Sequence, residues 1–157
     1  YTADDVIGIV SAFRRRNPDI TIATDIIVGF PGEEEDDVQK TLDIIGRMRP
    51  AKINITRYSP RPGTRAAAQK APVDRVKKDR SRLVQRHASE IYRQLNRPLM
   101  GSSQRVLVTE RIKPGTVLAR TDTYTGIVLH QDLPIGSELT ARITGDRTYF
   151  FLGEPYG

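Results

Sequence analysis

The chain has 157 residues, of which 38% are hydrophobic and 28% charged, and its formal net charge is +6. This composition is typical of a soluble globular domain, alone or with a small module, while the absence of cysteine excludes disulfides and thiolate metal ligands within these residues. No apolar run reaches membrane-spanning length, no signal peptide is visible and only two histidines occur, so we expect a cytoplasmic protein without a metal site of its own. The first residue is Tyr1 rather than methionine, which suggests a fragment.

The charge is unevenly distributed along the chain. Residues 1–46 carry 4 basic and 10 acidic side chains, residues 47–100 carry 15 basic and 3 acidic, and residues 101–157 carry 6 of each. A basic block of this size suggests a polyanionic partner, with nucleic acid first, although a solvated arginine-rich helix would give the same count.

The first half of the chain alternates between helical and strand patterns. A capping-box pattern at Thr2 predicts a helix up to residue 16, and apolar runs predict strands at 20–28 and 52–58 with a helix between them. The strand at 20–28 is apolar enough to be buried on both faces. The order helix–strand–helix–strand favours a parallel α/β unit that forms part of a barrel.

The first strand ends at a Gly-Phe-Pro-Gly turn that leads into the acidic start of a helix. Gly29 and Gly32 allow positive φ and close backbone approach, and Pro31 stiffens the turn. Such a junction holds polar or anionic ligand groups, or is an ordinary connecting loop; the residues leave both open. Asp25, inside the strand, either serves a ligand or is satisfied structurally. The acidic run 33–37 complements the helix dipole better than it would bind a metal.

A loop rich in proline and arginine follows the second strand and leads into a long basic helix. Arginines at 57, 61 and 65 suit phosphate or carboxylate groups, and the helix is predicted from about Pro72 to Asn96. His87 on this helix is expected to be a surface or packing residue rather than a catalyst.

Beyond a linker at 98–103, the period changes from helical to alternating. Five short runs, at 104–110, 117–121, 125–129, 138–143 and 148–152, predict a small barrel of the oligonucleotide-binding type. Its aromatic residues Tyr124, Tyr149, Phe150 and Phe151 either stack on bases or fill the core, and we expect core positions for the two phenylalanines.

Three stretches together carry a family resemblance. The segments Thr24-Asp-Ile-Ile-Val-Gly-Phe-Pro-Gly-Glu33 and Tyr58-Ser-Pro-Arg-Pro-Gly-Thr-Arg-Ala-Ala67, with the five-strand module, resemble radical SAM methylthiotransferases that modify tRNA. The segment Lys52-Ile-Asn-Ile-Thr-Arg57 is similar to the archaeal and eukaryotic branch acting on threonylcarbamoyladenosine next to the anticodon. The resemblance implies the C-terminal part of a radical SAM (partial TIM-type) barrel at 1–71, a basic helix and linker at 72–100, and a TRAM domain at 101–157.

The resemblance also implies cofactors, partners and site residues. S-adenosylmethionine (SAM) and 4Fe-4S clusters would be the cofactors, with the cluster cysteines outside this chain, so that the chain alone would be inactive and hold no catalytic residue. The residues expected to shape the SAM pocket are Thr24, Asp25, Gly29, Phe30, Pro31, Gly32, Glu33, Asn54 and Arg57, with Asn54 and Arg57 facing one cavity. The residues expected to contact tRNA are Arg61, Arg65, Arg75, Lys77, Lys78, Arg82, Arg105, Lys113, Arg120 and Tyr124.

Two alternatives belong to other classes of protein. A self-standing RNA-binding module would bind tRNA without any effect of SAM. An assembly element would pair its open sheet edges with another copy, because an open parallel sheet leaves backbone groups unpaired.

Overall fold

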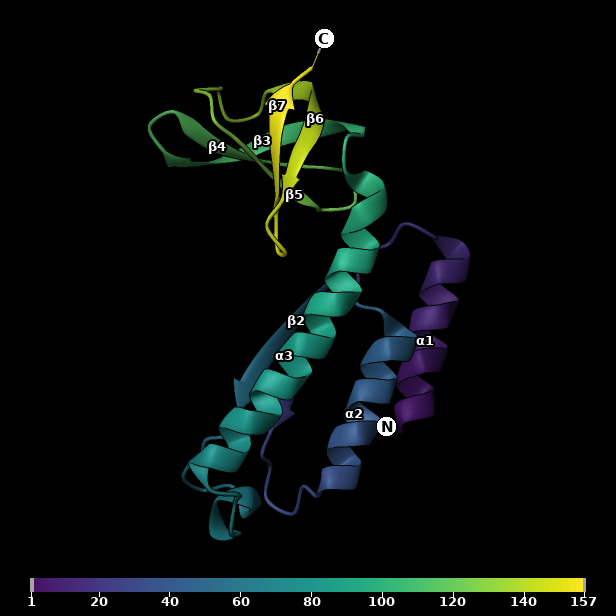
Figure 1. Ribbon diagram of the computed structural model, residues 1–157, viewed down its shortest axis with the longest axis vertical. Coiled ribbons are helices and arrows are strands. Elements are labelled where there is room, and N and C mark those ends of the chain that lie inside the picture. The colour runs from purple at the N-terminus through teal and green to yellow at the C-terminus, as the bar shows by residue number, and fades with distance from the viewer. Residues whose placement is uncertain (1, 157) are drawn as a thin grey trace. The chain divides into compact units, whose positions relative to one another are not determined.

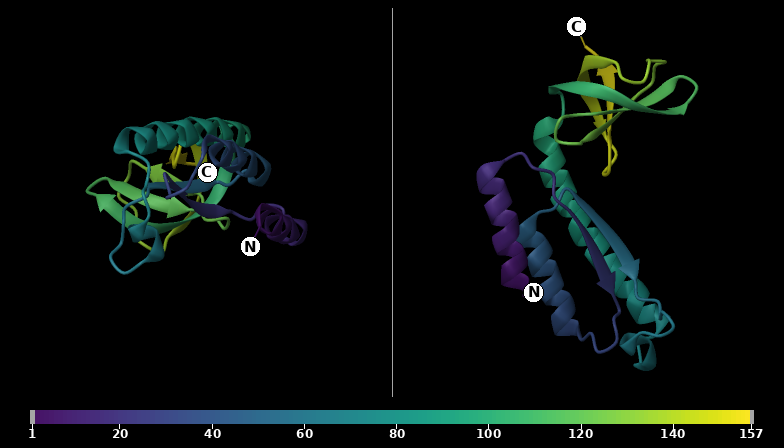
Figure 2. Two further views of the ribbon diagram at one scale, coloured as in Figure 1. Left: turned by 90° about the horizontal axis from the view of Figure 1, so that it is seen from below. Right: turned by 180° about the vertical axis from the view of Figure 1, so that it is seen from behind.

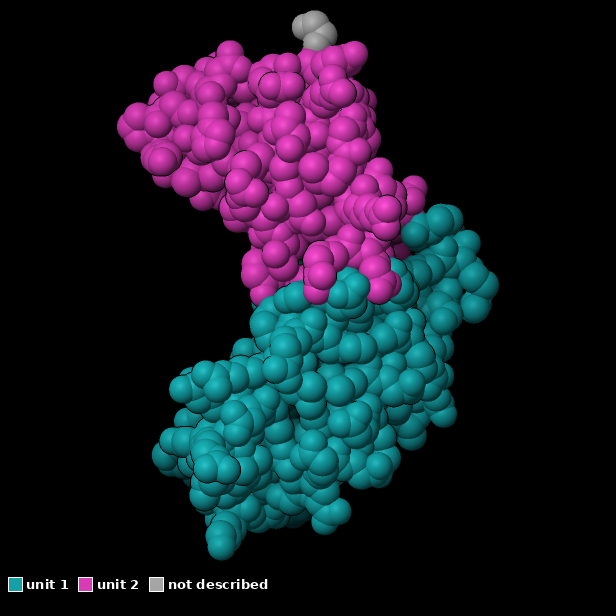
Figure 3. Space-filling view, viewed as in Figure 1, with its two compact units in different colours: residues 1–18, 22–91 teal, residues 19–21, 92–157 magenta. Residues whose placement is uncertain are grey.

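The computed structural model describes residues 2–156 and divides into two compact units (Figure 3). The first unit comprises residues 1–18 and 22–91, and the second comprises residues 19–21 and 92–157.

The first unit is an α/β layer around two parallel strands (Figure 1). Its elements are α1 (Ala3–Arg16), β1 (Ala23–Val28), α2 (Glu35–Met48), β2 (Lys52–Arg57) and the greater part of α3 (Asp74–Asn96). The predicted capping box at the start of α1 is confirmed, because the Thr2 hydroxyl accepts from the Asp5 N–H and the Asp5 carboxylate accepts from the Thr2 N–H. The order of the elements also confirms the predicted alternation of helices and strands, with β1 and β2 parallel.

The two strands have one covered face and one open face. Helices α2 and α3 lie against one side of the strands, and the view from behind shows the other side without a helix over it (Figure 2). Val28 and Ile53, on the covered side, are buried, whereas Asp25, Ile27 and Asn54 on the open side are exposed. The expectation that residues 20–28 are buried on both faces is therefore wrong, since no helix or strand among residues 2–156 covers the second face.

The second unit is a closed barrel of five strands in the order β3-β4-β5-β7-β6. All neighbouring pairs are antiparallel except β5 and β7, which are parallel. The predicted five-stranded barrel is thus confirmed, with these bounds: β3 (Ser103–Lys113), β4 (Thr116–Arg120), β5 (Gly126–Leu129), β6 (Glu138–Asp146) and β7 (Phe151–Pro155).

The barrel interior is filled by alternate residues of its strands. Val106, Val117, Ile127 and Phe151 belong to a single buried cluster. Phe151 therefore occupies the core position predicted for it, but Phe150 remains 38% exposed and its predicted core position is wrong. Phe150 precedes the first residue of β7, and successive side chains in extended backbone point to opposite sides.

Helix α3 ends at Asn96, followed by a short 3₁₀ turn (Arg97–Leu99) before the barrel. Among residues 2–156, no helix combines the length and apolar character needed to cross a membrane.

Candidate cofactor loop and nucleic-acid interface

The loop after β1 is a tight turn stabilised by its own backbone. The Glu33 N–H donates to the Phe30 carbonyl at 3.0 Å, which closes a turn with Pro31 second and Gly32 third. This turn requires positive φ at its third position, and Gly32 has φ +83°. Pro31 is buried, so the turn is anchored to the unit. The predicted roles of both residues in turn formation are confirmed.

Gly29 serves a different purpose, which is close approach to α3. Its φ is +73°, and a Cβ added there would lie 2.3 Å from Cγ of Lys77. The Lys77 stem therefore lies directly over the Gly29 backbone. No larger residue fits at this position without displacing Lys77.

A nearly buried ion pair joins the same loop to α3. Arg80 Nη1 donates to Glu33 Oε2 at 2.7 Å and to the Glu33 carbonyl oxygen at 3.0 Å. The Gly29 N–H also donates to Glu33 Oε2, at 2.7 Å. The two side chains are only 11% and 12% exposed. The Glu33 carboxylate thus accepts hydrogen bonds both from the backbone of the turn and from α3, and so joins the two.

The start of α2 is likewise capped from within the chain. Asp37 accepts from the Glu34 N–H at 3.0 Å, and Glu34 forms the other half of a capping box. The hydrogen bond from this backbone N–H holds the pKa of the Asp37 carboxyl below its usual value. The acidic run therefore stabilises the helix start, which is the role that its position in the sequence predicts.

Polar groups with no helix over them lie on the open face of the two strands. Asp25 and Asn54 are partners in the parallel register, and Asn54 Nδ2 donates to Asp25 Oδ1 at 2.7 Å. Asp25 is satisfied by this bond while its side chain stays exposed. At the end of the strands, Phe30 is 46% exposed and meets Tyr58 edge to face with ring centroids 5.1 Å apart. The open face offers a carboxylate and an amide, and an exposed aromatic ring lies in the loop at the end of the strands.

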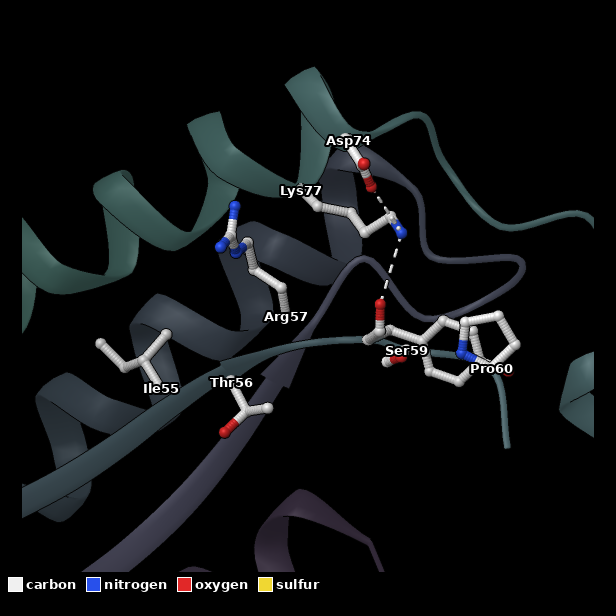
Figure 4. Close-up of a pocket in the computed structure, with 8 residues that line it drawn as sticks. Ile55, Thr56, Arg57, Ser59, Pro60, Asp74 and Lys77 are labelled. Carbon is white, nitrogen blue, oxygen red and sulfur yellow. Dashed lines mark hydrogen bonds and ion pairs between the residues drawn. The ribbon is translucent and has the colours of Figure 1, made fainter. Parts of the chain in front are cut away.

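Arg57 does not share this face. Side chains alternate along β2, so Arg57 falls on the side of Ile55 and points toward α3, while Thr56 points the opposite way (Figure 4). It lines a shallow hollow of about 570 Å³ with Asp74 and Lys77. The expectation that Asn54 and Arg57 face one cavity is therefore wrong. Thr24 is also on the side away from Asp25, since it alternates with it along β1.

The predicted RNA-contacting cations on α3 divide into two groups. Arg75, Lys78 and Arg82 are exposed at positions three and four residues apart, which places them on one helical stripe. Lys77 points into the unit instead: its side chain is 12% exposed, donates to the Tyr58 carbonyl at 3.3 Å and pairs with Asp74 at 3.0 Å. The prediction for Lys77 as an open phosphate contact does not fit this geometry, whereas Arg61 and Arg65, in the loop before α3, are exposed.

The cations predicted on the barrel lie in different settings. Arg105 pairs with Glu138 at 2.6 Å on the surface, and Lys113 is exposed at the end of β3. The guanidinium of Arg120 lies 4.5 Å from the ring centroid of Tyr124, whose side chain is 71% exposed. Of these residues, Arg120 and Tyr124 form a joint feature that a base could contact.

Arg80 is the residue that sequence reasoning missed. In the sequence it is one of many cations on a basic helix, and nothing local separates it from Arg75 or Arg82. The only available signal is the helical period, because Arg80 precedes the buried Val84 by one turn and so lies on the inward face.

The comparisons with known proteins agree with both units. Residues 99–155 match the TRAM domain family. The chain is 42% identical over 154 residues to a Pyrococcus horikoshii protein named "Probable threonylcarbamoyladenosine tRNA methylthiotransferase", and 37% identical to its namesake in Archaeoglobus fulgidus. It is 32% identical over 156 residues to a tRNA-2-methylthio-N(6)-dimethylallyladenosine synthase of Bartonella bacilliformis. Each match covers 98% of this chain but only 36%, 36% and 34% of the relatives, respectively.

The closed barrel is thus a TRAM domain, joined to an α/β segment. Over nearly its whole length the chain is similar to a segment of proteins named as tRNA methylthiotransferases, several of them of the threonylcarbamoyladenosine type. It spans about a third of the length of these relatives.

Proposed function

We propose that this chain is the C-terminal portion of a radical SAM enzyme that converts N6-threonylcarbamoyladenosine, next to the anticodon of tRNA, to its 2-methylthio derivative. Residues 1–71 would be the last part of the radical SAM barrel, residues 72–100 a basic helix and linker, and residues 101–157 the TRAM domain. The observation that carries the proposal is the similarity across 98% of the chain to relatives named for this reaction.

The uncovered surfaces of the first unit support a barrel continued by further chain. On α1, Val6, Ile9 and Phe13 are 37%, 49% and 55% exposed, and Ile27 on the open face of β1 is 55% exposed. Apolar side chains at helical spacing normally face a core. Further strands and helices of a barrel would cover them, with the open face of β1 and β2 becoming the inner wall.

The open face has groups that suit SAM. The Asp25 carboxylate fits the ammonium group of the cofactor, the Asn54 amide fits hydroxyl or carboxylate groups, and the exposed Phe30 ring fits the adenine. Thr24, Glu33 and Arg57 fit this role poorly, because they lie on the other face or are engaged with Arg80. Gly29, Pro31 and Gly32 would act by shaping the loop.

The described residues supply no ligands for an iron–sulfur cluster. The chain contains no cysteine, and no group of three potential ligands converges among residues 2–156. In the proposed whole enzyme the cluster and SAM supply a carbon-centred radical, with the cluster held by cysteines outside these residues. This chain would position SAM and RNA, and would be inactive alone.

RNA contact would come from α3 and the TRAM domain. The exposed stripe Arg75, Lys78 and Arg82 presents cations that suit phosphates, together with Arg61 and Arg65. The same feature favours the second candidate, a self-standing RNA-binding module. The two candidates differ in one respect, since the module would bind RNA with no contribution from SAM.

The direct test is nucleoside analysis of tRNA from cells that lack the whole gene and from cells in which it is restored. The proposal predicts that 2-methylthio-N6-threonylcarbamoyladenosine is absent from the first and present in the second. Its precursor, the unthiolated nucleoside, should accumulate in the deletion. Identical nucleosides in both strains would contradict the proposed reaction, and RNA binding without any change in nucleosides would favour the second candidate.

In the whole protein, Asp25→Asn is expected to weaken SAM binding by about tenfold or more, because a charge-assisted hydrogen bond would be lost. Calorimetric titration with SAM measures this without any need for turnover. Asp43→Asn is the matched control, since Asp43 is an exposed carboxylate on α2 that pairs with Arg47 at 3.5 Å. Equal SAM affinity of the Asp25→Asn and Asp43→Asn variants would show that Asp25 does not contact SAM.

A further inference from the structure

The connection between β4 and β5 holds an exposed aromatic residue in an unfavourable backbone conformation. Tyr124 has φ +68°, a region in which a bulky non-glycine side chain is strained, and 71% of its surface is exposed. The ring lies on the surface, so burial of apolar area does little to offset this strain. Strained residues cluster where function requires a particular side-chain direction.

A network of threonines holds the connection in this shape. The Tyr124 N–H donates to the Thr121 carbonyl at 2.9 Å, and the Thr121 N–H donates to the Thr125 carbonyl at 3.0 Å. The Thr125 N–H donates to the Thr121 hydroxyl at 3.1 Å, and that hydroxyl lies 3.0 Å from the hydroxyl of Thr123. The position of Tyr124 is therefore set by hydrogen bonds among four residues of the connection, Thr121, Thr123, Tyr124 and Thr125, and does not depend on a ligand.

One face of the Tyr124 ring is already occupied. Arg120, the last residue of β4, places its guanidinium carbon 4.5 Å from the ring centroid. This is cation–π geometry, and it originates from a rigid strand rather than from the loop. With most of the side chain exposed, the opposite face of the ring is open to solvent. A flat, rigid ring with one face covered by a cation and the other free is a stacking platform.

We infer that Tyr124 and Arg120 form a stacking site for one unpaired RNA base, with Arg120 close enough to serve a neighbouring phosphate. This inference rests on the proposed contact with RNA. It adds that the barrel surface binds an unpaired base. A duplex presents its bases only edge-on, so the site would select single-stranded segments such as loops. The barrel carries 6 basic and 6 acidic side chains, so stacking rather than charge would give it its affinity.

The backbone strain allows a variant that separates binding from stability. Tyr124→Gly removes the ring but suits φ +68°, so the melting temperature should change by no more than about 5 °C. Tyr124→Phe keeps the ring and should bind as the wild type does. Tyr156→Gly is the matched control: Tyr156 is 55% exposed and lies under Arg142 at 6.0 Å, but it has no positive φ.

The experiment measures binding of the full chain to a short single-stranded RNA containing one 2-aminopurine, and to the duplex of the same sequence. Stacking on Tyr124 quenches the fluorescent base. Tyr124→Gly is expected to weaken single-strand binding by about 5- to 150-fold and to abolish the quenching, with duplex affinity unchanged. Wild-type binding and quenching by Tyr124→Gly would overturn the stacking site while leaving RNA contact through α3 intact. Failure of the wild-type chain to bind either RNA would overturn both proposals.

Discussion

Arg80→Met is expected to lower the free energy of unfolding of the first unit by about 3 kcal/mol or more. The change removes one partner of an ion pair whose side chains are 11% and 12% exposed. Within the described part of the chain, the Gly29 N–H then remains as the partner of the Glu33 carboxylate. A nearly buried charge that loses its partner is strongly destabilising, whereas the intact pair itself adds little over an apolar substitute. Urea denaturation monitored by circular dichroism measures the change.

Two further variants make this expectation specific. The double variant Arg80→Met with Glu33→Gln should recover much of the loss, because the uncompensated charge is gone. Arg82→Met, two residues along the same helix, should change stability by no more than about 0.5 kcal/mol, since Arg82 is 64% exposed and lies 3.7 Å from Asp79. A similar small effect for Arg80→Met would show that Glu33 is not held by α3.

Gly29→Ala is the second large effect, expected at about 2 to 3 kcal/mol. A methyl group at this position would meet the Lys77 stem at 2.3 Å, and an alanine would also be strained at φ +73°. The comparison is Gly32→Ala, where φ is +83° but no atom lies within 4 Å of the added carbon. That variant bears only the backbone strain, at about 1 to 2 kcal/mol.

The difference in stability between Gly29→Ala and Gly32→Ala measures the energetic effect of the close contact between Gly29 and Lys77 of α3. Shortening Lys77 to alanine in the Gly29→Ala background should recover part of the difference, because the Lys77 Cγ and Cδ are the nearest atoms. Thermal melts of the wild type and these three variants give the comparison. Equal losses at Gly29 and Gly32 would mean that the Lys77 stem yields freely and that only backbone conformation matters.

Much of the fold follows from local patterns. The capping box at Thr2, the change of period after the linker and the glycine turns predict the order of the elements and the five strands of the barrel. The prediction succeeds most fully for the barrel. In a closed sheet every strand finds its hydrogen-bonding partners and its core within the same fifty or so residues, so local patterns are sufficient. In the first unit the predicted burial of β1 was wrong for one face. The apolar sequence of a strand predicts burial on both faces whether or not the chain contains the second layer that would cover it.

The site was predicted less completely, for two physical reasons. Charged residues on a basic helix look alike in sequence, so only the helical period of the neighbouring apolar residues separates the inward Lys77 and Arg80 from the outward Arg75 and Arg82. The Arg80 partner, Glu33, is 47 residues away and resembles one more member of an acidic helix start. The placement of Arg57, by contrast, was available from the alternation along its strand.

The proposed contact with RNA rests chiefly on the exposed stripe of cations on α3. The measurement that tests it most directly is tRNA binding across a salt series, for the wild-type chain and for a variant with Arg75, Lys78 and Arg82 changed to alanine. A control variant with Arg15, Arg16 and Lys40 changed to alanine has the same net charge as the α3 variant, but its α3 sequence is unchanged. Arg15, Arg16 and Lys40 are exposed on α1 and α2.

We expect the wild-type affinity to fall steeply with salt, because phosphate contacts release counterions. The slope of log affinity against log salt should fall by about two to three in the α3 variant and stay near the wild-type value in the control. Equal slopes in all three proteins, or no binding at low salt, would contradict an RNA contact on α3.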